Sequence, residues 1–64
     1  MKGYPYITVT RGLSTWFAVM IWWNPEMGGF PEPYDSGVGR YIEKDDAIVE
    51  AEMWAKEEGL ECVI

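Results

Sequence analysis

The sequence contains no histidine and a single cysteine, Cys62, among its 64 residues. The absence of histidine removes the commonest general base and the commonest metal ligand in proteins. Cys62 has no second cysteine with which to form an internal disulfide, and the residues after Met1 carry no secretory signal pattern. These two features predict a chain that works in a reducing, cytoplasmic compartment.

Basic residues and long apolar runs are also scarce. Five lysines and arginines face eleven aspartates and glutamates, which gives a net charge of −6 and a pI near 4.3. Direct binding to nucleic acid is therefore not expected, because phosphate contacts need Lys and Arg, whereas a basic protein surface is a favoured partner. The longest apolar run, Trp16 to Trp23, has eight residues, and a membrane-spanning helix needs about 20.

No group of residues has the pattern of a catalytic or cofactor site. Ser14 and Ser36 have no evident base beside them, and Cys62 has no cationic neighbour in the sequence. The acids of segment 43–46 lack the alternating spacing and the glycine bend of a calcium loop. The glycines of segment 35–39 lack the Lys-Ser/Thr of a phosphate-binding loop. We therefore predict a chain with no catalytic residue, metal site or cofactor, which is not an enzyme.

The order of patterns predicts a single small α+β domain over residues 1–64. Alternating or wholly apolar segments predict strands at 4–11, 15–23, 36–42 and 60–64. A helix is expected between the last two, and segment 24–35, with three prolines and adjacent glycines, is expected to be a long loop. The expected fold is a small antiparallel β-sheet in β-β-β-α-β order, with one helix packed on one face.

The helix is predicted from spacing within segment 43–61. Ala47, Ile48, Ala51, Trp54 and Ala55 recur at steps of three and four residues, which places them on one face of a helix. Two acids fall in the expected first turn, where they meet the positive end of the helix dipole. A glycine at position 59 is suited to the left-handed conformation that ends a helix.

The same segment carries the whole net charge of the protein. It holds eight acids and two bases, whereas the three acids and three bases elsewhere cancel. Its outward side is predicted to bind a partner through residues on two acidic flanks and an apolar strip between them. The first flank is Asp46, Glu50 and Glu57, the second is Asp45 and Glu52, and the strip is Val49 and Met53. Two interpretations remain: the charge steers the protein to a positive surface, or it only keeps the chain soluble.

The sheet offers a second candidate interface. Both faces of segment 15–23 are apolar, and we expect Phe17, Val19 and Ile21 to meet the helix together with Ile7 and Val9. One helix covers one face, so the row of Tyr6, Trp16, Met20 and Trp22 is expected on the open face. An apolar patch of this kind marks a contact site. Alternatively, Met27 and Phe30 of the long loop fold back over it, or a second copy covers it in a homodimer.

The acidic helix of segment 43–61, the small size and the absence of a catalytic set together resemble small acidic phage-encoded inhibitors of bacterial defence, including anti-CRISPR proteins. That resemblance implies a non-enzymatic nucleic-acid mimic, which inhibits a nucleic-acid-handling protein by presenting carboxylates to its basic surface. Strands followed by Asp-Asp-Ala-Ile-Val-Glu-Ala at 45–51 also resemble the sheet-then-helix segment of HicB-type antitoxins, which pair with a small toxin ribonuclease. The separate DNA-binding region that such antitoxins commonly carry is missing here.

Overall fold

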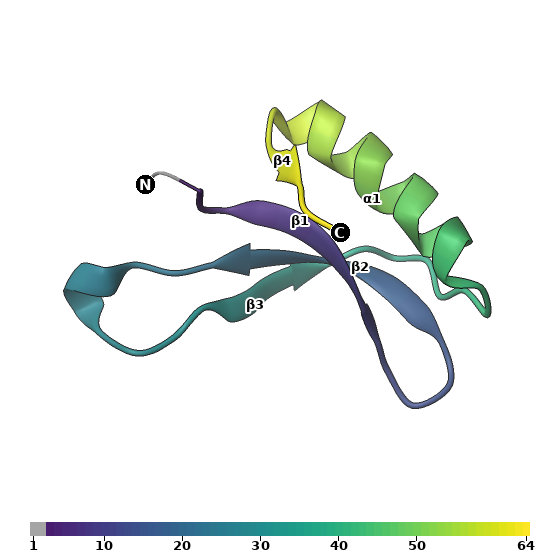
Figure 1. The fold of residues 1–64 in the computed structure, drawn as a ribbon, viewed down its shortest axis with the longest axis horizontal. Coiled ribbons are helices and arrows are strands. Elements are labelled where there is room, and N and C mark those ends of the chain that lie inside the picture. Colours follow the sequence, from purple (N-terminus) through teal and green to yellow (C-terminus); the bar gives the residue numbers. More distant parts are fainter. Residues whose placement is uncertain (1–2) are drawn as a thin grey trace.

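The computed structural model of the protein describes residues 3–64. Within these residues, four strands form one mixed sheet in the order β3-β2-β1-β4. The elements are β1 (Tyr6–Arg11), β2 (Trp16–Trp22), the short 3-10 helix η1 (Pro25–Met27), β3 (Glu32–Ser36), α1 (Lys44–Glu58) and β4 (Glu61–Cys62). α1 lies across one face of the sheet, and the β2–β3 hairpin extends beyond it as an arm (Figure 1). The predicted α+β class and β-β-β-α-β order are confirmed.

α1 approaches the sheet closely because its buried face is made of alanines. Ala47, Ala51 and Ala55 recur every fourth residue and are 0–3% exposed. Alanine favours the helix and adds little bulk between the helix and the strands. Ala51 and Ala55 pack in a small core with Ile7 and Met20 of the sheet. The predicted buried face of the helix is therefore confirmed.

The C-terminal end of α1 also follows the prediction. Gly59 adopts the left-handed conformation, with φ 71° and ψ 29°. The N–H of Leu60 donates to the carbonyl oxygen of Ala55 at 2.8 Å, which closes a Schellman-type cap. This cap turns the chain back toward the sheet, where β4 pairs parallel to β1. The purely antiparallel sheet of the prediction is therefore wrong, and the final strand is two residues long instead of five.

The predicted third strand at 36–42 lies further along the chain than the observed one. β3 covers Glu32–Ser36 and pairs antiparallel with β2, with an irregularity between Met20 and Ile21. A strand that contains Pro33 is tolerated here because β3 is an edge strand. Of the predicted strand, Ser36 belongs to β3, and Tyr41 makes an isolated bridge to Trp16. Segment 37–40 leaves the sheet instead.

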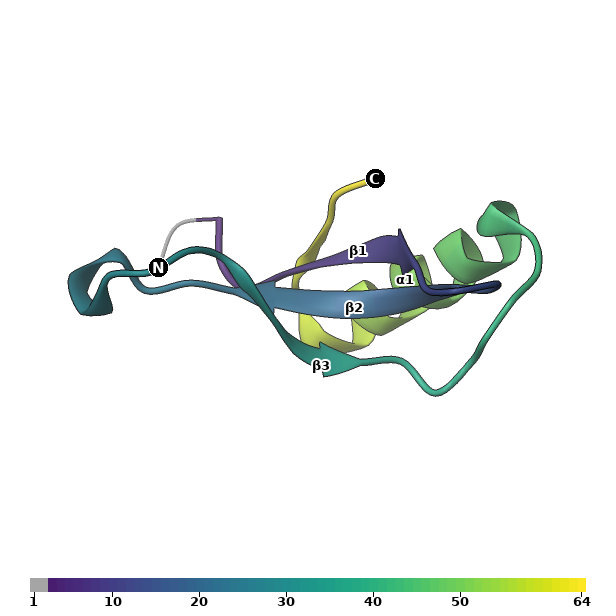
Figure 2. The same cartoon turned by 90° about the horizontal axis from the view of Figure 1, so that it is seen from below.

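The predicted face assignment of β2 is reversed. Arg11 pairs with Trp16 across the turn, so Ile7 lies opposite Met20 and Val9 opposite Ala18. Directly opposed residues share a face, and a shift of one residue exchanges the two faces of a strand. Met20 and Ala18 therefore meet α1, whereas Phe17 and Val19 lie on the opposite face of the sheet, where Val19 is 3% exposed. Figure 2 looks onto that face, with α1 behind the strands.

With this register, the four residues of the second predicted interface do not lie on one face of the sheet. Met20 is 8% exposed in the core, and Trp16 lies on the helix side with the Nζ atom of Lys44 at 5.3 Å from its ring centroid. Trp22 is 41% exposed toward the arm, and Tyr6 lies on the opposite face of the sheet. The four side chains therefore do not form one patch. The alternative in which the loop covers this face is also wrong, because Met27 and Phe30 are 79% and 83% exposed.

Candidate functional site

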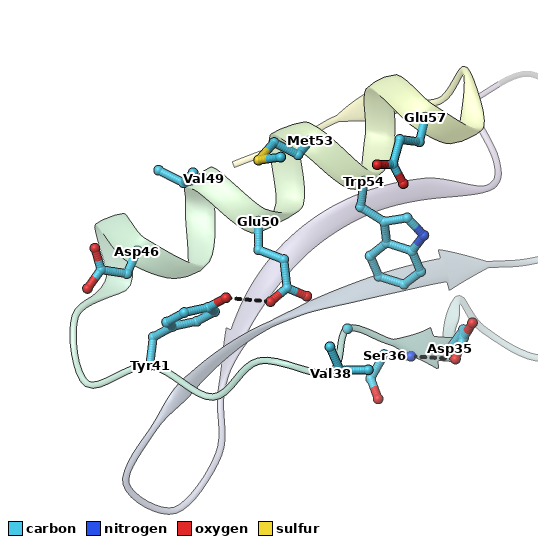
Figure 3. A pocket seen from close by; sticks show the side chains of 11 residues that line it. Asp35, Ser36, Val38, Tyr41, Asp46, Val49, Glu50, Met53, Trp54 and Glu57 are labelled. Carbon is cyan, nitrogen blue, oxygen red and sulfur yellow. Dashed lines mark hydrogen bonds between the residues drawn. The ribbon is translucent and has the colours of Figure 1, made fainter.

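A groove lies between α1 and the chain segment that leaves β3. It has a volume of about 770 Å³. Eleven residues line it, and we call it the α1 groove: Asp35, Ser36, Gly37, Val38, Tyr41, Asp46, Val49, Glu50, Met53, Trp54 and Glu57. Figure 3 shows Trp54 pointing from α1 toward the segment that carries Ser36 and Val38. The groove brings together five of the seven residues predicted to bind a partner.

Apolar side chains are exposed along this groove. Val49 and Met53, one helical turn apart on α1, are 58% and 61% exposed, and Val38 on the opposite wall is 98% exposed. The predicted outward position of Val49 and Met53 is therefore confirmed. Trp54 is half-buried between the groove and the core. Exposed apolar groups gathered in a concavity are typical of a surface that buries another molecule.

Acidic side chains stand around the apolar groups. Asp46 and Glu57 lie at opposite ends of the helical wall, and Asp35 lies on the strand wall (Figure 3). Asp46 and Glu57 are exposed. The remaining predicted residues, Asp45 and Glu52, are exposed but lie outside the groove. The two flanks are therefore unequal: one borders a groove, and the other is an acidic surface without one.

Glu50 has an internal role that the sequence did not reveal. Its carboxylate accepts a hydrogen bond from the Tyr41 hydroxyl at 2.7 Å and another from the Gly39 backbone N–H at 3.2 Å. It lies so close to the backbone that a Cβ atom at Gly37 or Gly39 would collide with it. The two glycines thus make room for a side chain that holds segment 37–41 against α1. Glu50 is a structural residue of the groove, and reversing its charge would disturb the fold.

The hydrogen bond between Tyr41 and Glu50 raises the pKa of Tyr41. The pKa of Tyr41 lies above its ordinary value of 10.0, chiefly because its hydroxyl donates to the Glu50 carboxylate, with contributions from burial and from the charges of Glu50 and Asp46. Tyr41 is therefore a neutral hydrogen-bond donor at physiological pH, and its bond to Glu50 is intact there.

The basic residues near this region are engaged elsewhere. The Arg40 guanidinium donates to the carbonyl oxygens of Gly37 and Gly39, at 2.7 and 2.9 Å, and lies 4.3 Å from the Phe17 ring centroid. Lys44 lies over Trp16. These two cations contact aromatic rings and backbone oxygens, and the side chains of Asp46 and Glu57 are exposed, so a partner's cations can reach their carboxylates.

No protein-family model, curated protein or solved structure matches the chain. The groove is therefore interpreted from its own chemistry. Among residues 3–64, no cluster of three or more acidic or cysteine side chains could hold a metal ion. In the same part of the chain, no helix combines the length and the hydropathy needed to cross a membrane. The groove combines exposed apolar side chains with acidic side chains at its ends, and hydrogen bonds to Glu50 hold one of its walls, segment 37–41, against α1.

The sequence pattern did not identify three of the residues that line the α1 groove. Asp35, Val38 and Tyr41 come from segments that were predicted to be loop or strand, and their contribution depends on how segment 37–41 folds back to α1. A signal was present in the Gly-Val-Gly triplet at 37–39, because paired glycines indicate close approach to another part of the chain. The sequence did not show that the approaching group is the Glu50 carboxylate.

Proposed function

We propose that this chain is a non-enzymatic binding protein that uses the α1 groove to engage a basic surface on a nucleic-acid-handling protein, and so inhibits it. The observation that supports this most strongly is the position of Asp46 and Glu57 at the two ends of an exposed apolar strip, Val49 and Met53. The carboxylates would occupy cationic positions that otherwise hold phosphates, and the apolar strip would exclude water from the contact.

The charge of Glu57 supports a role outside the fold. Glu57 lies in the last turn of α1, where the negative end of the helix dipole disfavours a carboxylate. Asp46, in contrast, lies in the first turn, where the dipole already favours it. Glu57 therefore lowers helix stability while contributing charge to the groove, which is consistent with binding. A net charge of −6 also accelerates the approach to a positive partner.

The anti-CRISPR-type role is the finer part of this proposal. It is tested by adding the purified chain to a panel of guide-loaded CRISPR effectors and measuring their binding to target DNA by electrophoretic mobility shift. We expect the wild-type chain to abolish DNA binding by a susceptible effector. If no effector responds, that role is wrong, and a pull-down from lysate with double-stranded DNA as competitor tests whether another nucleic-acid-binding protein is the target.

Two double variants of equal charge separate the groove from the overall field. Asp46→Lys with Glu57→Lys reverses the groove carboxylates and leaves Glu50 in place, whereas Asp45→Lys with Glu52→Lys makes the same charge change outside the groove. Loss of desolvated charge pairs costs about 2 kcal/mol or more, so the groove variant should inhibit about 30-fold more weakly. The control should stay close to wild type. Equal losses in the two variants would contradict a specific role for the groove.

The arm favours a second candidate function, a homodimeric or antitoxin-like interaction module. Four apolar side chains are exposed along the β2–β3 hairpin: Trp22, Met27, Phe30 and Tyr34, at 41%, 79%, 83% and 72%. These residues replace the divided sheet row as the apolar surface that a second copy or a toxin would cover. Sedimentation velocity tests self-association, with Phe30→Ser as the disrupting variant. A monomer at all concentrations would contradict the homodimer.

A further inference from the structure

The strand wall of the α1 groove has little free backbone to offer a partner. The N–H of Ser36 donates to the Asp35 side chain at 2.9 Å, and that of Gly37 donates to the Ala18 carbonyl oxygen at 2.9 Å. The N–H of Gly39 is bonded to Glu50, and the carbonyl oxygens of Gly37 and Gly39 accept from Arg40. Upstream, Pro33 has no N–H at all.

An extended peptide therefore finds no continuous row of free N–H and C=O groups along 36–39 to which it could be added as a further strand. Strand addition depends on a row of free N–H and C=O groups at a sheet edge. Along 36–39 the N–H groups of Ser36, Gly37 and Gly39 and the carbonyl oxygens of Gly37 and Gly39 are bonded within the chain. The opposite wall is α1, whose backbone is paired within the helix. An occupant would have to leave its own backbone groups unpaired or satisfy them internally. An α-helix satisfies them internally.

The charges of the groove determine which side chains a helix bound in it must carry. Asp46 and Glu57 are eleven residues apart on α1, which corresponds to about 16 Å at 1.5 Å per residue. Val49 and Met53 lie between them. A complementary helix carries apolar side chains at its centre and Lys or Arg about three turns apart. A second copy of this chain does not fit, because its own helix carries the same negative charge.

We infer that the α1 groove binds a basic amphipathic α-helix of its partner, in a side-chain contact that involves no strand pairing. This inference rests on the proposed function and names the structural class of the segment that is recognised. It places apolar anchors of the partner helix against Val38, Val49 and Met53, and its cations beside Asp46 and Glu57.

The test uses two synthetic peptides with the same leucine and lysine content. In the first, leucines recur at steps of three and four, which gives a helical apolar face; in the second, leucine and lysine alternate, which gives a strand pattern. Each is titrated into the full-length protein by calorimetry, and the circular dichroism of the mixture is recorded. We expect the helical peptide to bind at least about tenfold more tightly, or about 1.4 kcal/mol. It should gain helix on binding.

The groove variants assign the binding site. The Asp46→Lys, Glu57→Lys variant should weaken binding of the helical peptide by about tenfold or more, and the Asp45→Lys, Glu52→Lys control by much less. If the alternating peptide binds as tightly with the same dependence on Asp46 and Glu57, the groove accepts a basic partner but the helix inference is wrong. If neither peptide distinguishes the two variants, the inference and the proposed use of the groove both fail.

Discussion

Tyr41 and Glu50 hold the strand wall of the groove to α1, and the strength of this contact depends on pH. The pKa of Tyr41 is raised by its hydrogen bond to the Glu50 carboxylate. The folded state therefore retains the phenolic proton more tightly than the unfolded state does. The resulting stability is fully present below pH 10.0, the ordinary pKa of tyrosine, and is lost as pH rises through the raised pKa.

We expect Tyr41→Phe to be less stable than the wild type at neutral pH, and the difference to shrink above pH 10.0. Urea unfolding of the two proteins across this pH range measures the difference. The ultraviolet absorbance of phenolate, compared between them, identifies the titration of Tyr41. A tyrosine signal that disappears in Tyr41→Phe but titrates at or below pH 10.0 would contradict the assignment.

Cys62 should react slowly with thiol reagents. Its pKa is raised above 9.0, first by burial and second by the charge of Glu52. Only the thiolate is nucleophilic, so at neutral pH we expect iodoacetamide to modify the folded protein more slowly than the urea-unfolded chain. Glu52→Gln should increase the folded-state rate slightly, because it removes only the second cause. Equal rates in the folded and unfolded chains would show that the thiol is not protected.

Helical spacing was sufficient to predict which side of α1 faces outward. Asp46, Val49, Met53 and Glu57 follow from their positions along a regular helix, which the structure retains. Glu50 shares that spacing but is used internally. Its hydrogen bonds depend on residues nine and eleven positions away, whose approach is a property of the folded chain. Spacing along one element cannot show which of its side chains another segment will engage.

Among the elements, α1 depends on a glycine for its end. Gly59 has a φ of 71°, a region that costs an L-residue roughly 1–2 kcal/mol. Gly59→Ala should therefore lower the free energy of unfolding by about 1 kcal/mol. Glu58→Ala is the control: it removes a carboxylate from the negative end of the dipole and should be neutral or slightly stabilising. Urea unfolding compares them, and a Gly59→Ala protein as stable as wild type would exclude this cap from the stability of α1.

Segment 37–41 depends on two glycines for its contact with α1. A Cβ atom at Gly39 would collide with the Glu50 carboxylate and the Tyr41 hydroxyl, so both groups would have to move. Overpacking of this kind costs about 1 kcal/mol or more, so Gly39→Ala should lower the free energy of unfolding by that amount.

The exposed Val38 between the two glycines provides a matched control. Val38→Ala should change stability by no more than about 0.5 kcal/mol, because its side chain is 98% exposed. Both variants are compared with the wild type by urea unfolding. If Gly39→Ala unfolds at the same urea concentration as Val38→Ala, the glycine is not required for the contact between segment 37–41 and α1.

The sheet shows why strand faces were harder to predict than the helix face. Both faces of β2 are apolar, so hydrophobic pattern alone did not choose between Phe17 and Ala18 for the side that meets α1. The turn sets the choice by pairing Arg11 with Trp16. β3 was misplaced for a related reason: Pro33 indicates a loop, and only the position of β3 at the sheet edge makes this proline acceptable in a strand.

At the scale of the whole molecule, charge and exposed apolar surface are distributed unequally. α1 carries an acidic surface on both flanks, whereas the arm presents aromatic and methionine side chains at the other end of a body that extends 37 Å along its longest axis. Like charges on one helix repel each other and oppose folding. The same field attracts a basic partner, so salt should affect folding and binding in opposite directions.

Raising sodium chloride from about 0.01 M to about 0.15 M shortens the Debye length from about 30 Å to about 8 Å. We expect the thermal midpoint of the protein to rise, because screening relieves repulsion along α1, and its binding to the helical peptide to weaken. The Asp45→Lys, Glu52→Lys variant, whose net charge is −2 because each reversal adds two charges to −6, should show a smaller rise. A thermal midpoint that falls with salt in the wild type would mean that attraction between charges on and around α1 outweighs the repulsion between its carboxylates. The carboxylates of the groove would then be satisfied within the chain and no longer open to a partner.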